Sequence, residues 1–208
     1  MYTGRVATEL GLRQRKKQQT RQAIYEAARR LFAERGFDRV TVAEVARQAN
    51  VSEVTVFNYF PTKEDLFYGG MHFFEEELLE AVRLRKPGES AVRAFRRRLL
   101  DSVDGLRSKE RFVAIKRATE AFVASPSLAE RERQIVDRYT RTLAELLAGG
   151  TEPDVEAVTV ATALMGAHRA VVDYVRRRVQ AGARGDALAD DARTQIRKAL
   201  GRLERGLD

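Results

Sequence analysis

The placement of the helix-breaking residues is the strongest constraint on how this chain folds. Its four prolines, Pro61, Pro87, Pro126 and Pro153, each fall where a helical pattern of apolar residues stops or starts. Between these breaks the sequence has no long run of alternating β-branched residues, which is the pattern that predicts strands. The sequence therefore predicts an all-α fold.

Apolar spacing and capping residues give approximate bounds for the helices. Helices are expected over about 14–35, 42–48, 53–60, 62–82, 89–106, 109–124, 127–148, 154–181 and 186–205. Gly69 and Gly70 lie inside the predicted helix 62–82, where each glycine costs about 1 kcal/mol relative to alanine. We interpret them as a weak point at which this helix bends, with close packing against another helix as the alternative.

The composition excludes several kinds of chemistry. The chain has no cysteine, so it has no disulfide, no cysteine metal site and no thiol catalysis, and a reducing cytoplasm is expected. The sequence contains no phosphate-binding loop, no dinucleotide-binding glycine motif and no zinc-protease motif. We expect neither an enzyme nor a cofactor or metal. The longest uncharged apolar stretch, 157–168, is too short to cross a bilayer, so no membrane is expected.

The positive charge is concentrated in the first third of the chain. Residues 1–63 hold 12 basic and 6 acidic residues, whereas residues 64–208 hold 26 and 24. This asymmetry indicates contact with nucleic acid or another anionic surface. Docking on a membrane would require large apolar residues opposite the basic run at 13–21, where glutamine and threonine stand instead.

Residues 41–60, TVAEVARQANVSEVTVFNYF, have the layout of a helix-turn-helix. Thr41 and Glu44 form a capping-box pattern that starts the first short helix. Ser52 is a good N-cap for the second, and Pro61 ends it. The second helix is expected to expose polar side chains able to reach bases or phosphates in a major groove. The alternative is that two short helices only pack inside an all-α domain.

The segment TRQAIYEAARRLFAERGFDRVTVAEVARQANVSEVTVFNYFPTKEDLF resembles the DNA-binding domain of the tetracycline-repressor (TetR) family of bacterial regulators. The resemblance covers about residues 17–67. It implies a homodimeric transcriptional repressor, a double-stranded DNA operator and a small-molecule effector. It also implies phosphate contacts by Thr41, Ser52, Tyr59 and Lys63, and base contacts by Val54, Thr55 and Asn58.

Two positions depart from the family pattern. Glu53 stands where a basic or small residue is common; its carboxylate is repelled by phosphate but can accept a hydrogen bond from cytosine. Phe57 stands where tyrosine is common and has no hydroxyl for a phosphate, so we interpret it as a packing residue. Glu53 is retained among the predicted DNA-binding residues.

The last two predicted helices carry apolar residues on more than one face. In 186–205, the residues Ala189, Ala192, Ile196, Ala199 and Leu203 follow the spacing of a seam for a partner helix. The helix 154–181 is apolar nearly all round. The resemblance implies that these helices form the dimer interface; the alternative is that they only close the core of one chain.

An effector site is predicted among apolar and polar residues of the second part of the chain. The candidates are Phe67, Met71, Phe74, Phe112, Phe122, Met165, His168 and Arg169. Each apolar candidate can equally be plain core, and His168 can be a satisfied interior histidine. Apolar candidates favour a hydrophobic or amphipathic effector.

These predictions combine into one interpretation. Residues 1–66 form a three-helix DNA-binding domain, and residues 67–208 form a helical ligand-binding and dimerisation domain. The function expected is that of a cytoplasmic repressor released from its operator by a small ligand. The alternative is a DNA-binding architectural or adaptor protein without a ligand switch.

Overall fold

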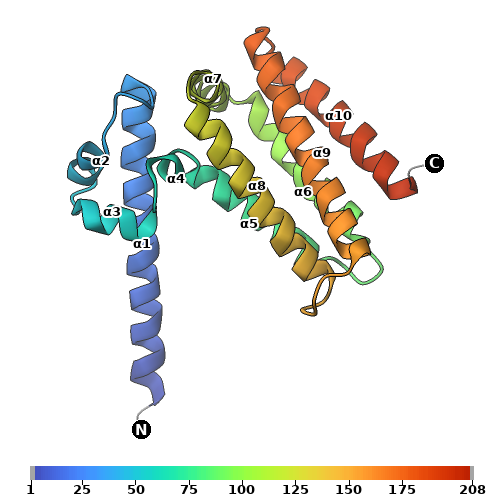
Figure 1. The fold of residues 1–208 in the computed structure, drawn as a ribbon, viewed down its shortest axis with the longest axis horizontal. Coiled ribbons are helices and arrows are strands. Elements are labelled where there is room, and N and C mark those ends of the chain that lie inside the picture. The colour runs from blue at the N-terminus through green and yellow to red at the C-terminus, as the bar shows by residue number, and fades with distance from the viewer. Residues whose placement is uncertain (1–2, 207–208) are drawn as a thin grey trace. The chain divides into compact units, whose positions relative to one another are not determined.

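The computed structural model describes the backbone of residues 3–206, with the side chains of residues 15–69 and 74–206. Throughout this part of the chain the ordered elements are helices and no strand occurs, which confirms the all-α prediction (Figure 1). The chain divides into two compact units, Met1–Met71 and His72–Asp208.

Most helices follow the predicted segments, but α1 begins at Thr3 instead of about residue 14, and the segment 62–82 is divided. Their bounds are α1 Thr3–Arg35, α2 Val42–Gln48, α3 Glu53–Tyr59, α4 Lys63–Phe67, α5 Gly69–Arg83, α6 Ala91–Val103, the 3-10 helix η1 Asp104–Arg107, α7 Lys109–Ala124, α8 Pro126–Leu147, α9 Val155–Gln180 and α10 Gly185–Arg205.

The N-terminal unit is built around the apolar stripe of α1. This helix packs against α2 and α4, and α2 packs against α3. Ile24 of α1, Val45 of α2 and Val56 of α3 are completely buried in the shared core. Burial of these three side chains from three helices holds α3 in one orientation on the unit.

The predicted helix 62–82 is two helices, because the chain turns at Tyr68 between α4 and α5. Gly69 therefore begins α5 instead of lying in a helix interior. A Cβ atom on Gly69 would lie 2.6 Å from Cδ2 of Tyr25 and 3.3 Å from Cε1 of Phe60. Real Cβ atoms essentially never come that close, so Gly69 permits close packing in the N-terminal unit, which is the alternative given above.

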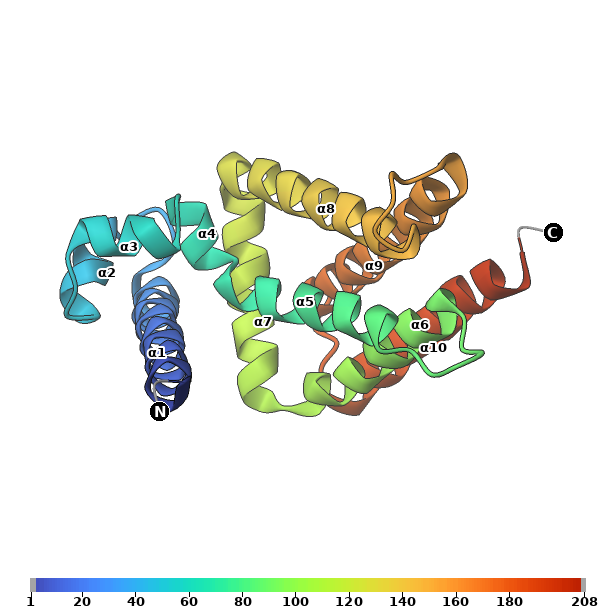
Figure 2. The ribbon, with the colours of Figure 1, turned by 90° about the horizontal axis from the view of Figure 1, so that it is seen from below.

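In the C-terminal unit, α9 lies between α8 and α10 (Figures 1 and 2). Helix α10 also packs on α6 and η1 of the same chain. Ala189, Ala192 and Ile196 of the predicted partner seam are buried in this packing. The prediction that these residues face a second copy is wrong, since they are buried within the chain itself. Apolar periodicity shows that a helix face is buried, but it does not show which element buries it.

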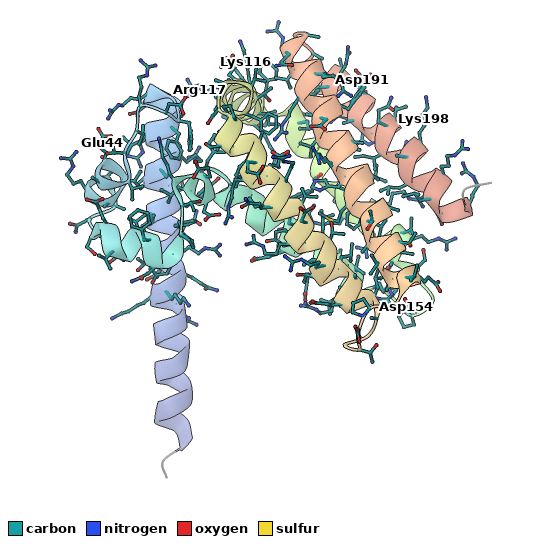
Figure 3. All side chains as sticks on the ribbon, viewed as in Figure 1. Glu44, Lys116, Arg117, Asp154, Asp191 and Lys198 are labelled. Carbon is teal, nitrogen blue, oxygen red and sulfur yellow. The ribbon has the colours of Figure 1, made fainter. Side chains whose placement is uncertain are left out.

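Helix α9 is covered on only part of its circumference. It starts after Asp154, whose carboxylate accepts a hydrogen bond of 2.8 Å from the backbone N–H of Ala157 (Figure 3). By length and composition alone, α9 is the helix within the described residues that could cross a membrane, although its longest uncharged stretch, 157–168, is shorter than a bilayer requires. Core helices pass the same test, but Val155 is 83% exposed and Val158 is 46% exposed. Helix α9 therefore keeps an uncovered apolar face.

Candidate nucleic-acid interface and effector site

The start of α2 is held by a capping box. The N–H of Glu44 donates to Oγ1 of Thr41 over 3.2 Å, and the N–H of Thr41 donates to Oε2 of Glu44 over 2.8 Å. Arg35, at the end of α1, pairs with the same carboxylate at 2.7 Å. The backbone and hydroxyl donors of Thr41 and the Arg35 guanidinium lower the pKa of Glu44 to about 2. Glu44, seen on α2 in Figure 3, thus remains charged and joins the ends of the two helices.

The turn between α2 and α3 is a helix-ending motif with an asparagine in the left-handed region. Asn50 has φ of 54°, a conformation that asparagine tolerates better than most residues. Its N–H donates to the carbonyl of Arg47 over 3.1 Å, and the N–H of Val51 donates to the carbonyl of Ala46 over 3.0 Å. These two bonds satisfy the last carbonyls of α2 and direct the chain into α3.

Helix α3 has one buried side and one solvent-facing side. Ser52 caps it by accepting the N–H of Thr55 over 3.1 Å, and the two hydroxyl groups lie 2.8 Å apart. Val56 points into the core, whereas Val54 is 70% exposed and Asn58 is exposed as well. The solvent-facing side of α3 therefore presents a row of side chains that a binding partner can contact.

Most of the predicted DNA-binding residues share this exposed region. Ser52, Glu53, Val54 and Asn58 are exposed, and Thr55 and Tyr59 are partly exposed on the same short helix and its cap. Thr41 is exposed at the cap of α2, and Lys63 is partly exposed at the start of α4.

Two predicted phosphate contacts already have partners within the chain. The hydroxyl of Thr41 donates to the Glu44 carboxylate over 3.0 Å. The ammonium of Lys63 lies 4.4 Å from the ring centre of Phe37 and donates to the carbonyl of Asp38 over 3.3 Å. These bonds fix both side chains, so a phosphate contact by either would exchange or share an existing bond.

Phe57 lies on the exposed side of α3, and the interpretation as a packing residue did not anticipate this. Its side chain is 45% exposed, and it is one turn from Val54. Residues three apart lie on the same side of a helix, so the spacing of Phe57 from Val54 was the sequence signal that could have predicted its exposure. An exposed aromatic ring and an exposed valine together give α3 apolar surface able to contact a thymine methyl group.

Basic side chains of α1 add positive charge to the same unit. Arg15, Lys16 and Lys17 are exposed, and the guanidinium of Arg21 lies 5.6 Å from the ring centre of Phe60, directly after α3. Arg13 lies outside the described side chains. The basic run therefore continues along α1 to the end of α3, as an interface with a phosphate backbone requires.

The predicted effector residues do not all gather at one place. The ring of Phe67 lies 5.5 Å from that of Phe37 and 5.1 Å from that of Tyr68, within the N-terminal unit. Met71 lies outside the described side chains. In the C-terminal unit, Phe112 and Phe122 are partly buried on α7, and Arg169 is exposed on α9.

Phe74, His168 and Met165 come closest to the predicted arrangement. The rings of Phe74 on α5 and His168 on α9 lie 5.5 Å apart, and Met165 is buried one turn before His168. Burial lowers the pKa of His168 to about 4, so this imidazole is neutral near pH 7. The contact joins α5 to α9 through neutral side chains.

Glu75, the most unusual polar residue described in the C-terminal unit, was not among the predicted site residues. Its side chain is 1% exposed, and neither carboxylate oxygen has a hydrogen-bond partner among the described residues. Burial, the main cause, raises the pKa of Glu75 to about 8. A signal was present: Glu75 stands in the same helical register as the buried Leu78, Leu79 and Val82, where a charge is out of place.

The fold and the exposed side of α3 define a class of protein. A capped helix-turn-helix with an exposed second helix, next to a basic helix, is a DNA-binding module. Residues 24–68 match the family described as bacterial regulatory proteins, tetR family. This segment is thus similar to the DNA-binding domain of that family of transcriptional regulators.

Individual curated relatives match over less than half of the chain. The chain is 33% identical over 85 residues to the HTH-type transcriptional regulator TcmR of Streptomyces glaucescens, covering 41% of this chain and 38% of TcmR. It is 37% identical over 68 residues to the nucleoid occlusion factor SlmA of Vibrio cholerae, covering 32% and 35%. The chain thus spans little more than a third of the length of these curated relatives.

A solved structure extends the similarity to both units. A TetR transcriptional regulator from Rhodococcus sp. RHA1 is 25% identical, with a TM-score of 0.55 and coverage of 92% of this chain and 98% of that one. The helical C-terminal unit therefore accompanies the DNA-binding module in a protein of the same family.

Proposed function

We propose that the chain is a homodimeric repressor that binds an operator in double-stranded DNA and leaves it when a small effector binds the C-terminal unit. The observation that carries the DNA-binding part is the exposed side of α3, with Glu53, Val54 and Asn58 facing solvent. Neither packing nor capping requires these three side chains. A regulator of this kind acts where the chromosome lies, so we place it in the cytoplasm.

The exposed side chains suit different parts of a duplex. The Asn58 amide can donate to and accept from adenine, and the Val54 methyl groups suit the methyl group of thymine. Glu53 can accept from the amino group of cytosine, and Thr55 can bond either kind of base edge. Thr41, Ser52, Tyr59 and Lys63 would contact phosphates and fix the register.

The uncovered face of α9 supports a homodimer. Its exposed residues repeat at helical spacing: Val155, Val158, Thr162, Gly166 and Ala170. The side chains on this face are mostly small or apolar, so a second copy of the same helix can pack against it closely. A dimer would place two reading helices on half-sites about 34–36 Å apart.

Sedimentation equilibrium tests the dimer. Wild-type protein should sediment as a dimer, and Val158→Glu should sediment as a monomer because it places a charge on the proposed interface. Val123→Glu is the matched control, because Val123 is 67% exposed and belongs to α7, outside the proposed face of α9. A monomeric wild type, or equal loss of dimer in both variants, would contradict the proposed interface.

Repression is tested by selecting genomic fragments that the protein retains and then transcribing from the promoters they carry. Added protein should lower transcript from such a promoter, and Asn58→Ala protein should not. Increased transcript would show an activator, and selective retention without any effect on transcription would exclude a repressor.

An architectural or adaptor protein without a ligand switch is the second candidate. The observation that favours it is the similarity to SlmA, a nucleoid occlusion factor. That candidate predicts DNA binding that no small molecule changes and retained fragments that bear no relation to promoters.

A further inference from the structure

One face of α5 carries a carboxylate into the core of the C-terminal unit. Glu75, Leu78, Leu79 and Val82 follow the spacing of a buried helix face, and all four are buried. Neither oxygen of Glu75 has a hydrogen-bond partner among the described residues. Such an arrangement is unfavourable, because a buried carboxylate is normally paired and hydrogen-bonded.

The same unit contains a buried carboxylate that is fully paired. Glu132 of α8 accepts hydrogen bonds of 2.8 Å and 2.5 Å from the two terminal nitrogens of Arg176 on α9. A two-pronged pair of this kind satisfies both the charge and the oxygens. Glu132 thus has a cation and hydrogen-bond donors, whereas the oxygens of Glu75 have no hydrogen-bond donor among the described residues.

The groups around Glu75 do not supply the missing donor. Arg138 of α8 acts on Glu75 electrostatically, but no hydrogen bond joins them within the described side chains. Tyr139, also on α8, has its pKa raised to about 12 by burial first and by the Glu75 charge second. His168, in ring contact with the adjacent Phe74, is kept neutral by burial.

A metal ion is a poor fit for this position. Within the described residues no three histidine, cysteine, aspartate or glutamate side chains come together as a metal site. Oxygen-ligated metals require several such ligands. Along α5, the residues next to Glu75 on its buried side are apolar: Leu78 and Leu79 are buried in the next turn, and the preceding Phe74 contacts the His168 ring.

We infer that Glu75 is the recognition group for the effector, and that the effector carries a protonated amine on an apolar body. This inference rests on the proposed ligand-controlled function. The ammonium group would donate to the two carboxylate oxygens that the protein leaves unpartnered, and charge-assisted bonds of this kind are strong when buried. The apolar body would contact the aromatic and aliphatic side chains of the same region.

Binding of this kind has a proton balance that can be measured. Because burial raises the pKa of Glu75 to about 8, the free protein holds this carboxyl mainly protonated near pH 7. The incoming ammonium ion keeps its own proton, and the carboxyl loses one to solvent as the ion pair forms. About one proton should therefore be released for each amine bound.

The test uses two fluorescent probes that differ in one charge. Dansylcadaverine carries a primary ammonium group on an apolar dye, and its N-acetyl derivative is neutral. The full chain should bind the amine about tenfold more tightly or better, a difference expected for one buried ion pair. Glu75→Gln should reduce that preference to less than about twofold, and the matched control Glu76→Gln, at an exposed position, should keep it.

Calorimetry of the wild type in two buffers of different ionisation enthalpy gives the proton release without any variant. Release of about one proton per bound amine supports the inference. Equal affinity for the two probes, no binding of the amine, an unchanged preference in Glu75→Gln, or binding without proton release would each overturn it.

Displacement from DNA separates this inference from the proposed function. If the amine binds through Glu75 but leaves DNA binding unchanged, the ligand switch fails and the recognition role of Glu75 stands. If only the neutral probe binds and releases DNA, the ligand switch stands and the amine inference fails.

Discussion

Replacing Glu75 by glutamine should remove a pH dependence from the stability of the folded chain. The pKa of Glu75 is about 8 in the folded protein, against an ordinary value of 4.5. Between these two values the folded chain keeps a proton that the unfolded chain has released. Stability linked to Glu75 is therefore fully present below about pH 4.5 and is lost as the pH rises to about 8.

The size of the effect follows from the two pKa values. Each pKa unit corresponds to about 1.4 kcal/mol, so the full loss is about 5 kcal/mol, of which about 3 kcal/mol is already lost at pH 7. Glutamine has nearly the same shape and no titratable proton. The free energy of unfolding of the wild type should therefore fall relative to that of Glu75→Gln throughout this range.

Urea denaturation followed by circular dichroism measures the difference. Wild type, Glu75→Gln and the exposed control Glu76→Gln would be compared at several pH values from about 5 to about 8.5, which bracket most of the change. Other titrating groups contribute equally to all three proteins. Parallel curves for wild type and Glu75→Gln would refute the reasoning, because they would show that Glu75 titrates alike in the folded and unfolded chains.

Four further substitutions test other parts of the structure. Gly69→Ala should lower the free energy of unfolding by about 1–3 kcal/mol, because its Cβ would overlap the Tyr25 ring; an unchanged urea midpoint would argue against that packing. In the wild type, the free energy of unfolding should decrease as the pH falls from 6.5 to about 4, because the imidazole of His168 takes up a proton in the unfolded chain but not in the folded one. His168→Gln should not show this decrease in urea denaturation. Thr55→Ala should weaken operator binding by about 1–3 kcal/mol and leave random DNA nearly unaffected, whereas Lys63→Ala should weaken both equally; anisotropy titrations would show whether the two variants behave alike instead.

Local chemistry made the helix-turn-helix predictable. Thr41, Ser52 and Thr62 each cap a helix through the side chain, so the starts of α2, α3 and α4 could be located from residue type and spacing alone. The turn at Tyr68 could not be found in this way. Gly69, the residue after the turn, packs closely against Tyr25, and a contact between residues this far apart cannot be read from the local sequence pattern.

The last two helices show a second limit to what the sequence alone can predict. Apolar spacing in α10 indicated a covered face, but the same pattern serves a partner helix and a neighbour within the chain. Ile196 turned out to be covered by the chain itself, whereas Val158 of α9 stays exposed. Glu75 was missed for a related reason, because a glutamate among neighbouring glutamates looks like part of a solvated face until the helix is placed against its neighbours.

Sequence-specific DNA binding is the claim on which the whole interpretation depends, and one titration decides it. Fluorescence anisotropy would follow binding of the full chain to the DNA flanking its own gene across a salt series, with random duplex as competitor. We predict saturable binding that resists the competitor and weakens steeply with salt, because both base and phosphate contacts form. Equal, weak affinity for the two duplexes would contradict the assignment of the exposed side of α3 as a reader of this site.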